Sequence, residues 1–167
     1  MYTVLLQDIA SNGFAVVSVD HPYDADIVEY PDDRTVLGTN ITTNTEFLLA
    51  QNVRVKDMSF VLDQIQDENA VKGIFPLSKG NSNLLSLDRV SLFGLGSTAA
   101  QTILVDDRFV GGINLDGALW GSVVNIGLSK PFLLFGHTNY TQATDATWKK
   151  FWSKIARMET GARARAV

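Results

Sequence analysis

A short run in the middle of the chain has the residue types that an α/β enzyme uses to build a reactive turn. The run 90–93 suits a buried strand, Gly94-Leu95-Gly96 suits a tight turn, and Ser97-Thr98-Ala99-Ala100 suits the start of a helix. Glycines in the turn permit a backbone path that a Cβ atom would obstruct. A strand, turn and helix of this kind can present either a nucleophile or a set of phosphate-binding amides.

Two chemistries fit this turn. A nucleophile elbow has the pattern Gly-x-Ser-x-Gly, whereas the residues around Ser97 are Leu95-Gly96-Ser97-Thr98-Ala99. Ser97 is therefore a candidate substitute nucleophile, and the alternative is a serine at the N-cap of the helix. The second chemistry is dinucleotide binding, because Gly94-Leu95-Gly96-Ser97-Thr98-Ala99 satisfies G-x-G-x-x-G/A. In that hypothesis Asp116, 20 residues after Gly96, is the ribose-binding acid.

Other polar side chains follow predicted strands, where α/β proteins place their ligands. Asp116 could orient a catalytic histidine, or it could cap a turn with Gly117. His137 is a possible general base, or a structural histidine. His21 belongs to the polar segment 20–24, for which we predict a hydrogen-bond network that positions the loop.

The elements that must position these residues alternate between helix and strand. A hairpin turn is predicted at Pro31–Arg34, between strands over 27–30 and 35–37, and a loop is predicted over 73–86. The apolar spacing predicts helices over 2–11, 43–66 (either two helices with a break near Asn52 or one bent helix), 97–105 and 145–158, and further strands over 14–19, 90–93, 112–115 and 131–135. This alternation predicts an α/β fold with a mostly parallel sheet. The apolar faces of the second and last helices are predicted to be Val53, Met58, Val61, Leu62 and Ile65, and Trp148, Phe151, Trp152 and Ile155.

Composition narrows the classes of protein to which the chain can belong. A length of 167 residues with 46% hydrophobic content predicts one domain over 1–158, and the tail 159–167, which lacks an apolar pattern, is predicted to be disordered. A net charge of −4 with 14 basic residues gives no broad cationic face, which argues against nucleic acid as a partner. No apolar run approaches the ~20 residues of a membrane-spanning helix. The absence of cysteine excludes disulfides and zinc–thiolate sites.

The sequence gives little indication of location. Residues 1–6 have neither the basic start nor the long apolar core of a signal peptide, so we expect no signal peptide in this chain. The sequons Asn40-Ile41-Thr42 and Asn139-Tyr140-Thr141 would accept glycans in a secretory pathway. Secretion therefore stays open.

Several blocks outside the turn carry a resemblance to a known family. They include Asp20-His21-Pro22-Tyr23-Asp24-Ala25, Leu87-Asp88-Arg89-Val90, Ile113-Asn114-Leu115-Asp116-Gly117 and Pro131-Phe132-Leu133-Leu134-Phe135-Gly136-His137. In order and spacing, over roughly residues 2–157, the chain resembles the platelet-activating factor acetylhydrolases, particularly their fungal members. The resemblance implies an α/β-hydrolase fold, with a mostly parallel sheet flanked by helices. It also implies a Ser-His-Asp mechanism, without metal or cofactor, that hydrolyses the acetyl or short acyl ester of phospholipids.

The resemblance also assigns roles to individual residues and predicts that parts of the family's catalytic site are missing from this chain. Asp116 matches the family's catalytic acid, whereas His137 matches a different family position from the base. The family's turn reads approximately F-G-H-S-x-G-G-x-T-A-A; Phe93-Gly94 and Thr98-Ala99-Ala100 match its flanks, but its histidine and serine have no counterpart here. The family's first strands and oxyanion loop precede Tyr2, and its catalytic histidine follows the last helix. We therefore expect an incomplete fold, truncated at both ends, whose catalysis is impaired or absent.

Overall fold

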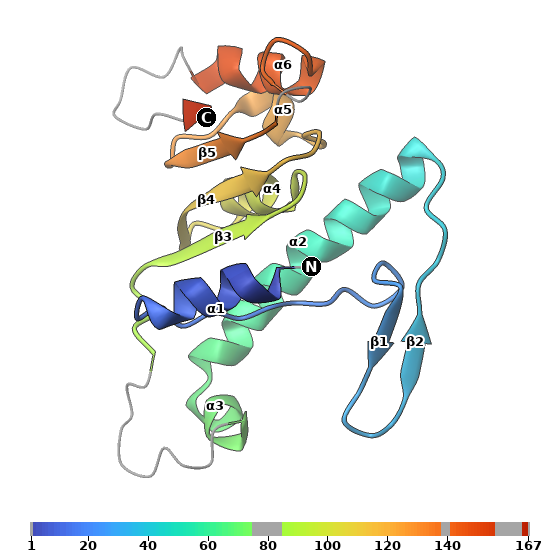
Figure 1. The fold of residues 1–167 in the computed structure, drawn as a ribbon, viewed down its shortest axis with the longest axis vertical. Coiled ribbons are helices and arrows are strands. Elements are labelled where there is room, and N and C mark those ends of the chain that lie inside the picture. The colour runs from blue at the N-terminus through green and yellow to red at the C-terminus, as the bar shows by residue number, and fades with distance from the viewer. Residues whose placement is uncertain (1, 75–84, 138–140, 156–164, 167) are drawn as a thin grey trace. The chain divides into compact units, whose positions relative to one another are not determined.

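The computed structural model describes residues 2–74, 85–137, 141–155 and 165–166, and these form two compact units (Figure 1). Unit 1 contains the described residues up to 40 together with 85–86. Unit 2 contains the described residues 41–74 and those from 87 onward. The domain boundary predicted at residue 158 lies outside the described residues and stays a prediction.

Unit 1 contains one helix and one hairpin. Helix α1 spans Thr3–Ser11, and Gly13 follows it with a φ of 88°, a left-handed conformation that suits glycine. Strands β1 (Ile27–Glu29) and β2 (Thr35–Leu37) pair antiparallel, with Val28 opposite Val36. Both the first helix and the hairpin are confirmed.

The strand predicted over 14–19 is wrong. This segment has no regular secondary structure, and the side chains of Phe14 and Val17 are 67% and 54% exposed. A strand needs a hydrogen-bonded neighbour, and none of the described strands pairs with this segment. Apolar composition indicated a strand, but composition alone does not supply the partner that would hold one.

Unit 2 is built on a parallel sheet. Its strands follow the order β3-β4-β5-β6, and each neighbouring pair is parallel. Helices α4 (Thr98–Val105) and α5 (Val123–Ile126) connect the first three strands, which confirms the predicted α/β architecture. Only two residues of the predicted tail 159–167 are described, and they form β6. The strands span Val90–Gly94 (β3), Phe109–Leu115 (β4), Phe132–Phe135 (β5) and Arg165–Ala166 (β6).

The longest helix of the described chain is α2, which spans Asn44–Gln66 without the break near Asn52 that was one of the two predicted alternatives. Its buried residues are Gln51, Val55 and Leu62, so the predicted face was partly wrong: Leu62 lies in the core, whereas Val53 is 44% exposed. Helix α3 (Glu68–Ile74) follows and overlaps the start of the predicted loop 73–86. Among the described helices, none has both the length and the apolar content needed to cross a membrane.

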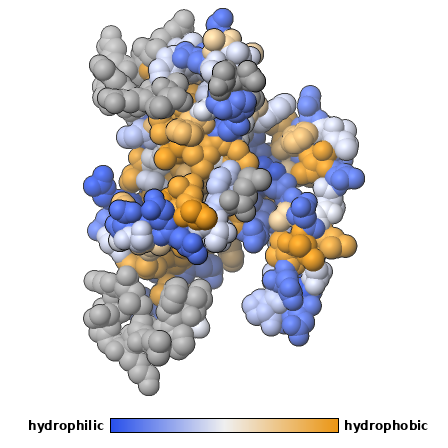
Figure 2. Space-filling model, in the orientation of Figure 1, coloured by the Kyte–Doolittle hydropathy of each residue, from blue (hydrophilic) through white to orange (hydrophobic). Residues whose placement is uncertain are grey.

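The core of unit 2 lies between the sheet and its helices. Helix α6 (Ala146–Ile155) buries Trp148, Phe151 and Ile155 and leaves Trp152 partly buried, which confirms the predicted apolar face. Phe151 meets Phe132 of β5 edge to face, with ring centroids 5.9 Å apart. Figure 2 shows apolar side chains gathered over the strands of this unit. The largest fully buried side chains include Trp148, Phe109, Phe151, Ile103, Leu119 and Leu134.

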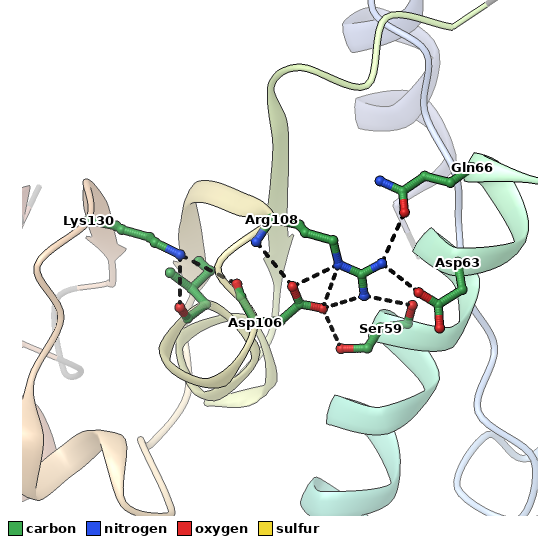
Figure 3. Close-up of polar contacts among 7 residues, drawn as sticks. Ser59, Asp63, Gln66, Asp106, Arg108 and Lys130 are labelled. Atoms are coloured by element: carbon green, nitrogen blue, oxygen red, sulfur yellow. Dashed lines mark hydrogen bonds and ion pairs between the residues drawn. The ribbon is translucent and has the colours of Figure 1, made fainter.

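A polar cluster fastens α2 to the turn between α4 and β4 (Figure 3). The guanidinium of Arg108 donates to both carboxylate oxygens of Asp106, through Nε at 2.9 Å and Nη2 at 2.7 Å. It also pairs with Asp63 and donates to Gln66 on α2. Ser59 donates its hydroxyl to Asp106 across 2.8 Å. The two elements are therefore joined by charge-assisted hydrogen bonds as well as by apolar packing.

These hydrogen bonds change the titration of the cluster. The guanidinium of Arg108 holds the pKa of Asp106 well below its usual range, with a smaller contribution from the Ser59 hydroxyl. Asp106 and Asp63 raise the pKa of Arg108 in return. Because the carboxylate of Asp106 has a lowered pKa in the fold, its contribution to stability is present at neutral pH and is lost only in strong acid.

A capping box begins α2 and gives a testable pH dependence. The Thr43 hydroxyl accepts from the amide of Glu46, and Glu46 accepts from the amides of Thr42 and Thr43. The Thr42 amide, followed by the Thr43 amide and hydroxyl, lowers the pKa of Glu46 from 4.5 to about 2. The contribution of Glu46 is therefore present above about pH 4.5 and is lost as the pH falls through about 2.

We expect Glu46→Ala to lower the free energy of unfolding at pH 7 and to lower it progressively less as the pH approaches 2. Urea denaturation at several pH values measures this difference. Glu68→Ala in α3 is the control, because Glu68 makes only an exposed ion pair with Lys72. A loss for Glu46→Ala that stays constant across this pH range would contradict the capping role.

Candidate active site at the carboxyl end of the sheet

The turn after β3 has the strand, turn and helix form that the sequence predicted. Strand β3 ends at Gly94, Leu95 follows with 51% of its surface exposed, and Gly96 has a φ of 71°. Helix α4 then begins at Thr98. The exposed side chain at this turn is therefore that of a leucine, in the region where an elbow would expose its nucleophile.

Ser97, the candidate substitute nucleophile, lies at the N-cap of α4. Its side chain makes no capping hydrogen bond, its carbonyl accepts from the amide of Gln101, and the residue is only 5% exposed. A nucleophile must reach a substrate carbonyl, and the hydroxyl of an elbow serine is exposed for that reason. The burial of Ser97 favours the N-cap interpretation, and its catalytic role stays a prediction.

Asp116 directly follows β4 and has a left-handed backbone, with a φ of 61°. Its amide donates to the carbonyl of Phe135 on β5 across 2.7 Å, and its own carbonyl accepts from the amide of Gly96 across 3.0 Å. A Cβ atom on Gly117 would lie 2.9 Å from the Gly96 nitrogen. The turn after β3 and the turn after β4 are thus in backbone contact, and this contact requires glycine at position 117.

The carboxylate of Asp116 has one partner and one buried oxygen. Oδ2 lies 3.4 Å from Nε2 of His137, which follows β5. Oδ1 is buried and accepts no hydrogen bond from the described residues. Two of the predicted candidates, Asp116 and His137, are therefore brought together, because the carboxyl ends of neighbouring parallel strands meet at one edge of the sheet.

The loop after Asp116 is held by polar side chains that the sequence interpretation missed. Gln51 of α2 donates to the carbonyl of Trp120 across 2.8 Å, and Gln101 of α4 accepts from the amide of Val123 across 3.0 Å. The amide of Leu119 donates to the hydroxyl of Thr147 on α6 across 2.9 Å. A polar residue at a core-facing position of a helix, such as Gln101 among small and apolar neighbours, was the feature of the sequence that could have indicated these contacts.

The segment around His21 belongs to unit 1. The amides of Asp24 and Ala25 donate to the carbonyl of His21, and Thr39 donates to the carbonyl of Tyr23 through its amide and its hydroxyl. These contacts form the loop through main-chain carbonyls, and the network predicted from the polar side chains of 20–24 stays a prediction. Among the residues that the structure describes, no group of three or more His, Cys, Asp or Glu side chains is placed to hold a metal ion.

Comparison with known proteins finds two similar esterases. No protein-family model matches the chain. A curated protein of Arthroderma benhamiae, a probable 1-alkyl-2-acetylglycerophosphocholine esterase, is 33% identical over 165 residues, which cover 95% of this chain and 39% of the relative. The chain is similar to an esterase of the platelet-activating factor acetylhydrolase type. It spans about two fifths of the curated protein's length.

A solved structure agrees with this relationship. The ferulic acid esterase from Streptomyces cinnamoneus matches 98% of this chain with a TM-score of 0.71 and 28% identity, and the match covers 45% of the esterase chain. The sheet and helices of unit 2 thus have an α/β-hydrolase-like architecture that corresponds to part of a larger chain in that enzyme. Both of these similar proteins are named as esterases.

Proposed function

We propose that the chain carries the elbow and the acid of a carboxylic ester hydrolase of the platelet-activating factor acetylhydrolase type, and that its hydrolytic step is impaired at the elbow. The observation that carries this proposal is Asp116 at the carboxyl end of β4. Its backbone is hydrogen-bonded to the turn after β3, and its Oδ1 is buried and accepts no hydrogen bond from the described residues. The substrate class that the relatives suggest is a phospholipid or another ester with a short acyl chain.

The acid's part in such a reaction follows from its geometry. A carboxylate at this place can accept the N–H of a catalytic imidazole and stabilise the imidazolium that forms when a serine hydroxyl is deprotonated. The buried Oδ1 of Asp116 supplies the required acceptor. At the turn, however, Leu95 offers no hydroxyl and Ser97 is buried, so the covalent route lacks an exposed nucleophile there.

Two alternative activities remain testable. In the first, Ser97 becomes accessible and acts as the nucleophile. In the second, the run 94–99 and Asp116 bind a dinucleotide, as the spacing of the glycines allows. The contact between Oδ2 of Asp116 and His137 argues against this second activity, because a ribose would compete with His137 for that oxygen.

The test uses a fluorophosphonate probe, which labels activated serines. We expect neither the unaltered chain nor Ser97→Ala to be labelled, because the Ser97 hydroxyl is buried. Labelling that is present in the unaltered chain and absent from Ser97→Ala would show that Ser97 is a nucleophile and that the elbow is active.

Ligand binding is measured on the same protein by thermal unfolding. We expect a short-chain ether analogue of a phospholipid, which cannot be hydrolysed, to raise Tm, since a ligand that binds only the folded state stabilises it. NAD serves as the comparison and should leave Tm unchanged. A rise with NAD and none with the phospholipid analogue would favour the dinucleotide hypothesis and overturn the proposal.

A further inference from the structure

The carbonyl of Gly117, one residue beyond Asp116, accepts two hydrogen bonds from different elements. The Asn114 side chain donates from Nδ2 across 2.8 Å, and the Trp148 indole donates from Nε1 across 2.9 Å. Both donors are fully buried, with 0% and 1% of their surfaces exposed. Two buried donors on one loop carbonyl fix the peptide plane between residues 117 and 118, which lies one unit beyond the peptide that joins Asp116 to Gly117.

This peptide plane matters because Asp116 has a backbone conformation that side-chain-bearing residues adopt rarely. Its φ of 61° is in the left-handed region, which a non-glycine residue keeps only when its surroundings impose it. Hydrogen bonds on both sides of the residue supply that restraint. The amide of Asp116 donates to the carbonyl of Phe135, and its carbonyl accepts from the amide of Gly96. The bonds to Gly117 add the third restraint, on the next peptide unit.

We propose that Asn114 and Trp148 are positioning residues that hold Asp116 in this conformation and so direct its carboxylate toward His137 and toward a further donor. The inference rests on the proposed function, in which Asp116 is the acid of the site. Asn114 acts from within β4, two residues before Asp116. Trp148 acts from the first turn of α6, and it thereby links the placement of a whole helix to the placement of one carboxylate.

The first turn of α6 is itself built for this contact. Asp145 accepts from the amide of Trp148 across 2.8 Å and from the hydroxyl of Thr147, which in turn accepts from the amide of Leu119 in the loop. Helix α6 therefore contacts the loop at two points: the hydroxyl of Thr147 and the indole of Trp148. Apolar packing would place a phenylalanine ring at position 148 equally well, but it would not supply the N–H that binds Gly117.

The test is Trp148→Phe, which keeps an aromatic ring in the core and removes only the donor and part of the ring volume. Trp152→Phe is the matched control, because Trp152 lies on the same helix and is partly buried. NMR spectra at constant pH report the amides of Gly96 and Gly117 and the ring of His137. We expect Trp148→Phe to shift these resonances several times more than Trp152→Phe does. Equal small shifts in the two folded variants would overturn the proposal.

The converse variant keeps both tryptophans, so that it does not depend on how Trp148→Phe folds. Asp116→Gly relieves the backbone restriction, and it should shift the indole N–H resonance of Trp148 while that of Trp152 stays in place. An unchanged Trp148 signal would show that the indole and the acid are not coupled. These resonances do not depend on turnover or on probe labelling, so failure of the proposed enzymatic function and failure of this inference give different results.

Discussion

Replacing Trp148 with alanine is expected to lower the free energy of unfolding by about 3–5 kcal/mol, the usual cost of removing a large buried aromatic side chain. Trp148 is 1% exposed and belongs to the same core cluster as Phe151 and Leu119. Its loss would leave a cavity and would also remove one of the two donors to Gly117. Because small domains are stable by only about 5–15 kcal/mol, the variant should unfold at much lower urea concentration.

Urea denaturation followed by far-UV circular dichroism measures this effect without relying on the tryptophan signal that the change removes. Trp152→Ala is the matched control, and its loss should be clearly smaller because Trp152 is only partly buried. Equal losses for the two variants would mean that α6 does not pack on the core through Trp148.

The second large effect is expected from Gly112→Ala in β4. A Cβ atom at this position would lie 2.4 Å from the carbonyl oxygen of Leu92 and 2.7 Å from Cδ1 of Ile103. The Ile103 side chain can move, but the Leu92 oxygen belongs to the neighbouring strand, which is paired to β4 at this position. We expect a loss of about 3 kcal/mol in the free energy of unfolding, at the upper end of typical overpacking costs.

Gly94→Ala is the control for this experiment, because a Cβ atom there would meet nothing within 4 Å and the residue ends the adjacent strand. Alanine at position 94 should leave the denaturation midpoint nearly unchanged. If Gly112→Ala were as stable as Gly94→Ala, the close approach of β3 and β4 at Leu92 would be incorrect.

Local patterns predicted most of the helices and strands of unit 2. The apolar spacing of 145–158 was sufficient to place Trp148, Phe151 and Ile155 in the core. The proximity of Asp116 and His137 could also be predicted from the sequence, since parallel strands bring their carboxyl ends to one edge of the sheet. The segment 14–19 shows the limit of this reasoning, because strand formation depends on a neighbour that lies elsewhere in the chain or beyond it.

The contacts that fix the loop after Asp116 could not be predicted. Gln51, Gln101 and Trp148 reach the loop from three helices that are distant in the sequence. Each of them bonds a main-chain atom of the loop, and a main-chain partner cannot be recognised from the residue types. The left-handed backbone of Asp116 was equally hidden, because aspartate adopts that conformation only as an exception. The place of Leu95 in the turn after β3, in contrast, could be predicted from the order of residues.

The bonds that locate residue 116 come from its main chain: the amide donates to Phe135 and the carbonyl accepts from Gly96. None of them involves the carboxylate. The backbone position of residue 116 is thus defined independently of its carboxylate, and asparagine, which tolerates a left-handed backbone, could occupy it with the scaffold intact. A lineage with this scaffold could lose or regain an acid here by a single codon change, without refolding the surrounding protein.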